Sequence, residues 1–192
     1  AVNTGDNVDA TIALDMEDES TVALYTGNTI MLQGRTGVST IRRLDALTGK
    51  EVWAYTVPDL TYTTEGTVGC VASPVVGQNK ASGLVYFTVT NGLKAATMYA
   101  LDKATGAVKW TFALSSPTVS SPVAVYNANG DAWIVQAEGN GKLHLIDAKT
   151  GTEASSMQLE GSVESSPAVY RDVLVIATTG SDTSYIYGIK LE

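Results

Sequence analysis

The stretch Met98–Trp110 reads M-Y-A-L-D-K-A-T-G-A-V-K-W and joins two apolar runs through a polar turn. Short runs rich in aromatic and β-branched residues on either side of a glycine-containing turn are typical of a β-hairpin. Asp102 can accept hydrogen bonds from the amides of the turn, and Gly106 can adopt the positive φ that closes it. The stretch therefore predicts a strand, a tight turn and a second strand that contains Trp110.

The same pattern recurs along the chain. Three copies of D-x-x-T-G begin at Asp45, Asp102 and Asp147 and end at Gly49, Gly106 and Gly151. A Ser-Pro pair precedes each later unit, at Ser73-Pro74, Ser121-Pro122 and Ser166-Pro167. Both markers recur roughly every 45–60 residues, which is the range expected for the blades of a β-propeller. Because turn geometry accounts for the Asp and the Gly, we interpret them as structural residues of the repeat.

The units divide into short strands and predict an all-β fold. We expect a single domain over residues 1–192, a β-propeller or half-propeller of four-stranded antiparallel blades, with helix nearly absent. About four blades are present, at residues 8–68, 69–118, 119–162 and 163–192. The last blade lacks one strand, so the ring is partial. In the first blade we place the first strand at residues 9–14 and a long connection at residues 56–68.

Charge and composition exclude several classes of function. Twenty acidic residues against twelve basic ones give a net charge of −8. Such a field repels phosphate backbones, so we expect no nucleic-acid partner. No apolar run is long enough to predict a membrane span. Cys70 is the single cysteine, which excludes an intramolecular disulfide, and its apolar neighbours predict a small buried side chain.

Few residues suggest a site. The acidic run that contains Asp15, Glu17, Asp18 and Glu19 could bind Ca²⁺ through its carboxylates, but it lacks the spacing of a known calcium loop, and we favour a solvated surface loop. His144 is the only histidine and takes the place of a strand residue of the other repeats, so we interpret it as a packing residue. We therefore predict no catalytic and no cofactor-binding residue.

The motif D-x-x-T-G-x-x-x-W, after an apolar run and a Ser-Pro pair, resembles the repeat of the quinoprotein-like (PQQ-like) β-propellers over nearly the whole chain. The resemblance implies that the tryptophan of one blade packs on its neighbour, a role that falls to Trp53 and Trp110. Ser155 stands at this position in the third blade, where we expect a different packing. Complete rings of the family have seven or eight blades, so either the natural protein is longer or two copies complete a ring.

Enzymes of this family bind pyrroloquinoline quinone with Ca²⁺ and oxidise alcohols or sugars. The resemblance is to the non-enzymatic branch, because the cysteine is single and half a ring cannot surround a cofactor. We expect a non-catalytic scaffold module of a bacterial secreted or cell-surface protein that contacts protein partners through loops and edges, located outside the cell or in its envelope. The alternatives are part of a PQQ-dependent dehydrogenase and a carbohydrate-binding surface module.

Overall fold

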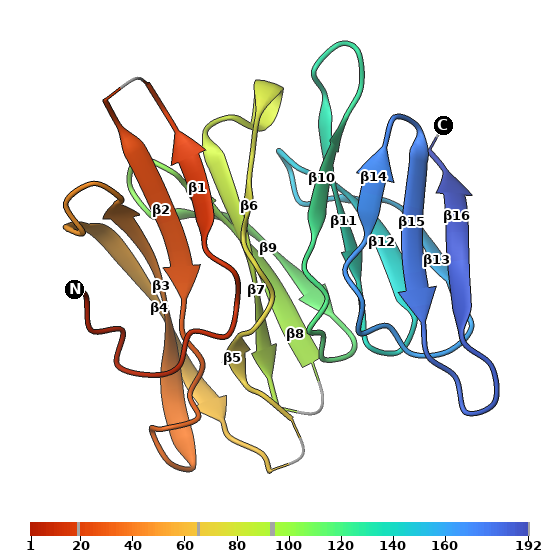
Figure 1. The fold of residues 1–192 in the computed structure, drawn as a ribbon, viewed down its shortest axis with the longest axis horizontal. Helices are drawn as coiled ribbons and strands as arrows, with labels where there is room; N and C mark the ends of the chain where they lie inside the picture. The colour runs from red at the N-terminus through yellow and green to blue at the C-terminus, as the bar shows by residue number, and fades with distance from the viewer. Residues whose placement is uncertain (19, 65, 93–94, 192) are drawn as a thin grey trace.

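The computed structural model describes residues 1–18, 20–64, 66–92 and 95–191, and these residues form four antiparallel sheets in chain order (Figure 1). We call each sheet a blade and number the blades 1 to 4. Blade 1 contains β1 (Ala13–Met16), β2 (Val22–Gly27), β3 (Thr36–Asp45) and β4 (Glu51–Thr61). Blade 2 contains β5 (Gly69–Cys70), β6 (Val75–Val76), β7 (Leu84–Asn91), β8 (Ala95–Asp102) and β9 (Val108–Leu114).

The two later blades are more regular. Blade 3 contains β10 (Val123–Tyr126), β11 (Ala132–Ala137), β12 (Lys142–Asp147) and β13 (Glu153–Gln158). Blade 4 contains β14 (Ala168–Tyr170), β15 (Val173–Thr178) and β16 (Tyr185–Lys190). Within the described residues the only helical element is the 3-10 turn η1 (Asn79–Ala81). The predicted all-β architecture with an incomplete last blade is confirmed.

The repeated turn adopts the predicted geometry. Asp102 Oδ1 accepts the amide of Thr105 at 3.0 Å, and Gly106 has a φ of 72°. The carboxylates of Asp45 and Asp147 accept the equivalent amides. Since the side chain of the Asp replaces a missing backbone partner and the Gly takes the left-handed conformation, these residues are sufficient to form the turn without any ligand.

Blade 1 differs from the prediction at both ends. Its first strand is β1 at Ala13–Met16, not residues 9–14, so Asp15 belongs to a strand. The connection that we predicted at residues 56–68 begins later, after Thr61, because β4 continues to that residue opposite β3. Val57 and Leu60 are 6% and 2% exposed and anchor this extension. Burial of these two side chains explains why a segment with Pro58 and Asp59 remains extended.

The first strand of blade 2 is split. β5 and β6 pair separately with β7 and leave Ser73-Pro74 between them. Proline has no amide hydrogen and cannot donate to a sheet, which accounts for a break at this point.

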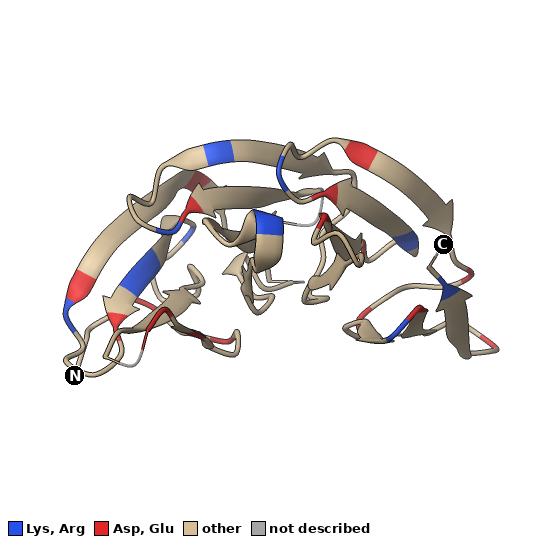
Figure 2. Cartoon of the chain, turned by 90° about the horizontal axis from the view of Figure 1, so that it is seen from above, with Lys and Arg blue, Asp and Glu red and all other residues tan. Residues whose placement is uncertain are grey.

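Adjacent blades pack face to face. Three apolar clusters contain side chains of two successive blades each, such as Ile41 with Val85, Tyr86 with Ile134, and Val135 with Leu174. Seen from above, the blades follow an arc with the two termini at its ends (Figure 2). The first strands of neighbouring blades contact one another, so they form the inner side of the arc. The described residues do not close a ring.

Candidate functional site at the blade interfaces

The indole of Trp53 in β4 packs on the repeated turn of blade 2. A Cβ placed on Gly106 would lie 2.7 Å from Cδ2 of Trp53, so only glycine admits the ring. Trp53 Nε1 donates to the carbonyl of Lys103 at 2.8 Å. Gly106 is therefore required twice, by the φ of its turn and by the tryptophan of the preceding blade.

Blades 2 and 3 repeat this contact. A Cβ on Gly151 would lie 2.6 Å from Cδ2 of Trp110. Trp110 Nε1 and the hydroxyl of Tyr86 both donate to the carbonyl of Ala148, at 3.1 and 2.9 Å. The roles implied for Trp53 and Trp110 thus correspond to observed contacts between blades.

The interface of blades 3 and 4 is built differently. Ser155 lies opposite Leu145 in the register where Trp110 lies opposite Ala100. In place of an indole contact, the hydroxyl of Tyr187 accepts the amide of Glu160 at 3.1 Å. A cluster that includes Val135 and Leu174 buries the remaining surface.

Hydroxyl side chains connect the blades along the inner side of the arc. The amide of Thr11 donates to Ser73 Oγ at 3.1 Å, that of Ser73 to Ser121 Oγ at 2.9 Å, and that of Ser121 to Ser166 Oγ at 3.0 Å. We call these four residues the hydroxyl ladder. The Ser of the Ser-Pro marker therefore has a definite function, because each one accepts a hydrogen bond from the preceding blade.

Two carboxylates of the acidic run in blade 1 form ion pairs with cations of the same and of the next blade. Asp15 Oδ2 accepts Lys103 Nζ of blade 2 at 2.6 Å, and Glu17 Oε2 accepts Arg43 NH2 at 2.6 Å. Asp18 instead accepts the amide and hydroxyl of the nearby Ser20.

Glu19, the fourth candidate for a calcium ligand, lies outside the described residues. Among the residues that are described, no three His, Cys, Asp or Glu side chains lie close enough to hold a metal ion. Through its ion pair with Lys103, Asp15 belongs to the interface of blades 1 and 2, which its place in an acidic run did not indicate.

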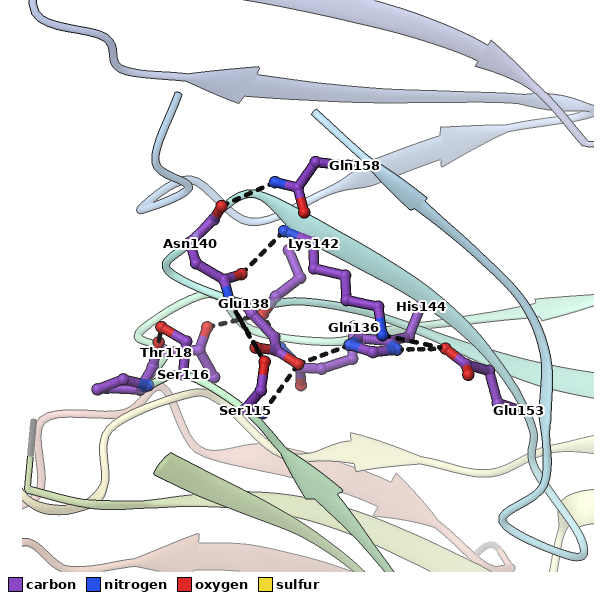
Figure 3. Close-up of polar contacts among 12 residues, drawn as sticks. Ser115, Ser116, Thr118, Gln136, Glu138, Asn140, Lys142, His144, Glu153 and Gln158 are labelled. Carbon is purple, nitrogen blue, oxygen red and sulfur yellow. Dashed lines mark hydrogen bonds and ion pairs between the residues drawn. The ribbon is translucent and has the colours of Figure 1, made fainter. Parts of the chain in front are cut away.

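A buried ionic network surrounds His144 (Figure 3). The ring is 2% exposed and lies between two carboxylates, with Nε2 2.7 Å from Glu138 Oε1 and Nδ1 2.7 Å from Glu153 Oε1. The side chains of Glu138 and Glu153 therefore fix the ring at both of its nitrogens.

Glu138 extends the network to blade 2. It accepts the amide of Ser115 at 3.1 Å and the Ser115 hydroxyl at 2.6 Å. Burial acts to raise the pKa of Glu138, but the hydrogen bonds from Ser115 and His144 outweigh it and hold the pKa below its ordinary value. Phe112 of blade 2 meets the His144 ring edge-on. The network therefore joins blades 2 and 3.

A second buried contact joins the same two blades. Thr88 donates to Gln136 Oε1 at 2.8 Å, and Gln136 Nε2 donates to the carbonyl of Ser120 at 3.1 Å. Cys70 is fully buried, as predicted, and burial raises the pKa of its thiol to about 12. These groups are buried between the blades and hold them together.

These features define the class of the protein: an arc of β-propeller blades joined by a repeated tryptophan contact and buried polar bonds. The family model described as outer membrane protein assembly factor BamB matches residues 39–129 and 94–187. The chain therefore belongs to this family of PQQ-like propeller repeats. No helix in the described residues is long and apolar enough to cross a membrane.

Curated relatives match over a shorter part. The chain is 33% identical over 88 residues to the beta-alanine-activating enzyme of Mus musculus and 31% identical over 88 residues to that of Homo sapiens. Each match covers 45% of this chain and 8% of the relative. The chain thus spans less than a tenth of the length of these relatives.

Solved structures show the same fold. BamB from Moraxella catarrhalis matches with a TM-score of 0.66 and 17% identity, over 99% of this chain and 52% of that one. The computationally designed Ika4 protein matches with a TM-score of 0.56 and 15% identity, over 96% of this chain and 92% of that one. A europium-containing methanol dehydrogenase matches with a TM-score of 0.54 and 14% identity, over 76% of this chain and 33% of that one.

Proposed function

We propose that the chain is a non-catalytic scaffold that binds a protein partner at the end of blade 1, in a bacterial cell-envelope or secreted protein. The observation that carries the proposal is a group of exposed apolar side chains on the loop between β2 and β3 and on the start of β3. Met31, Leu32 and Val38 are 40%, 71% and 39% exposed, and we call them the blade 1 tip. Exposed apolar groups held on a rigid base are a common feature of binding surfaces.

The blade 1 tip is fixed by side-chain hydrogen bonds. Gln33 Oε1 accepts the amide of Val38 at 2.9 Å and Gln33 Nε2 donates to its carbonyl at 2.9 Å. Asp6 Oδ2 accepts the amide of Leu32 at 2.9 Å. A surface ordered before binding loses little conformational entropy when a partner docks. The extension of β3 and β4, at the lower end of blade 1 in Figure 1, gives the tip its base.

The family supports this proposal and its location. The matching description names an outer membrane assembly factor, which favours a protein-binding function in the cell envelope. The net charge of −8 favours a partner other than nucleic acid.

A dehydrogenase function has weaker support. The inner side of the arc, where a cofactor on the propeller axis would be held, carries the hydroxyl ladder. Its three serines accept backbone amides of the preceding blade. A quinone with Ca²⁺ needs carboxylates and other hard oxygen ligands that converge. The described residues on this side do not fit such a group.

A photo-cross-linking experiment tests the proposal. Leu32 and Leu47 are both 71% exposed, but Leu47 lies in the repeated turn between β3 and β4, away from the blade 1 tip. We expect a photoreactive amino acid at position 32 to give a discrete cross-linked protein in an envelope extract, and the same group at position 47 to give none. Equal cross-linking from both positions, or none from position 32, would contradict the proposal.

A further inference from the structure

The face of blade 4 that points away from blade 3 is apolar and is uncovered in the described structure. Tyr170, Val173, Val175 and Ile186 are 74%, 41%, 43% and 79% exposed, and we call these four residues the terminal face. A shallow hollow on it is lined by Tyr170, Val173 and Val175 among others. At the three interfaces inside the chain, the equivalent face of a blade is covered by the next blade.

The register shows this equivalence directly. Val175 lies opposite Ala168 as Val135 lies opposite Val123 in blade 3. Val135 is 2% exposed because blade 4 covers it, whereas Val175 is 43% exposed. The terminal face therefore has the composition of one side of a blade interface, but no blade packs on it in the described structure.

Blade 1, at the opposite end of the arc, carries the complementary side of a blade interface. Leu14 and Met16 of β1 are 61% and 82% exposed, and we call them, with Leu24, the initial face. Leu14 pairs with Leu24 as Val169 pairs with Leu174 in blade 4. Leu174 is fully buried against blade 3, so the initial face is the side that a preceding blade covers.

We propose that a second copy of this chain completes the ring, with the terminal face of each copy packed on the initial face of the other. The two faces lie at opposite ends of an arc (Figure 2). Two identical contacts of this kind close a ring when each copy spans half of the circle.

The hydroxyl ladder continues across the proposed contact. Thr11 takes the place of the marker serine in blade 1, so a hydroxyl is kept there although the following proline is not. Within the described residues the Thr11 hydroxyl receives no amide, and the Ser166 amide has no acceptor. Across the contact, the amide of Ser166 would donate to the Thr11 hydroxyl of the second copy, as the amide of Ser121 donates to Ser166.

The segment around Val2 favours, as partner of the initial face, a blade without the packing tryptophan, such as blade 4 of a second copy. Val2 lies where the tryptophan of a preceding blade would pack, because its Cγ2 is 3.7 Å from a Cβ placed on Gly49. Arg42 also holds this segment by donating to the carbonyl of Thr4 at 3.1 Å. A preceding blade with a fourth strand would need this space. Blade 4, with three strands in the described structure, leaves it free.

The mass of the 192-residue chain in solution, measured by light scattering after size exclusion at high micromolar concentration, tests the proposal. We expect twice the chain mass of 20.1 kDa. A monomer would overturn the proposal, and so would a series of larger species, since these indicate contacts that do not close.

Two variants identify the faces. Met16→Arg and Ile186→Arg change side chains that are 82% and 79% exposed in one copy, so both should fold and run as monomers. Their equimolar mixture should form a heterodimer, because one of its two contacts has neither arginine. The control Met157→Arg alters a 43% exposed residue on the outer strand of blade 3 and should keep the wild-type mass. A mixture that does not associate would overturn the proposal, whatever the outcome of the cross-linking at the blade 1 tip.

Discussion

Replacing Trp110 with alanine removes the contact that joins blades 2 and 3. The indole packs on Gly151, lies 5.7 Å from the Tyr86 ring between centroids, and donates to the carbonyl of Ala148. Truncating a buried aromatic side chain costs about 3–5 kcal/mol. Since Trp110 is only partly buried, we expect the lower end of this range, about 3 kcal/mol, of which the hydrogen bond accounts for about 1 kcal/mol.

Urea unfolding followed by circular dichroism measures this loss, with Leu47→Ala as a matched control on an exposed side chain. Gly151→Ala should also destabilise the protein, because its Cβ would overlap the indole and its φ is 74°. In the double variant the overlap disappears and only the backbone strain remains, so the two losses should not add. A loss below about 0.5 kcal/mol for Trp110→Ala, or full additivity, would refute the account of the interface.

Three further predictions concern buried polar groups. Because the pKa of Glu138 is lowered, ionised Glu138 should stabilise the fold at pH values above the ordinary carboxyl pKa of 4.5. This stabilisation should be lost as the pH falls through the pKa of Glu138 in the folded protein. The difference in unfolding free energy between wild type and Glu138→Gln, measured by urea unfolding, should therefore shrink in acid. Lys103→Met should cost about 3 kcal/mol because it leaves Asp15 without its cation, and Lys103→Met with Asp15→Leu should recover part of the loss; no recovery would contradict the pairing. The Cys70 thiol should not react with a thiol reagent in the native protein and should react fully in denaturant, and rapid native labelling would show that it is accessible.

The fold was predictable because its signals are local. The Asp and Gly of the repeated turn fix a hairpin within five residues, and the copies at Asp45 and Asp147 show how often it recurs. The Ser-Pro marker was recognised as a repeat signal, but its function was not. The hydrogen bond from Ser73 to Ser121 joins residues in different blades, and the sequence alone does not place these blades side by side.

The residues of the interfaces were predicted less completely, because their contacts also join residues that are far apart in the sequence. The sequence indicates His144 as a packing residue, and its ring is 2% exposed, but neither carboxylate beside it was identified. Glu138 directly precedes a turn signal at residues 139–141, which was the available indication that it folds back beside His144. The acidic run suggested a solvated loop because Lys103, the cation that pairs with Asp15, lies in the next blade. The extension of β4 depends on burial of Val57 and Leu60, which composition did not reveal.

The glycine of the repeated turn in blades 2 and 3 lies against the tryptophan of the preceding blade. Proton NMR tests it directly, since protons above the face of an indole ring resonate upfield. We predict upfield Hα signals for Gly106 and Gly151 with cross-peaks to the indoles of Trp53 and Trp110, and an ordinary shift for Gly49, which faces Val2. Ordinary shifts at all three glycines, without cross-peaks to tryptophan, would contradict the account.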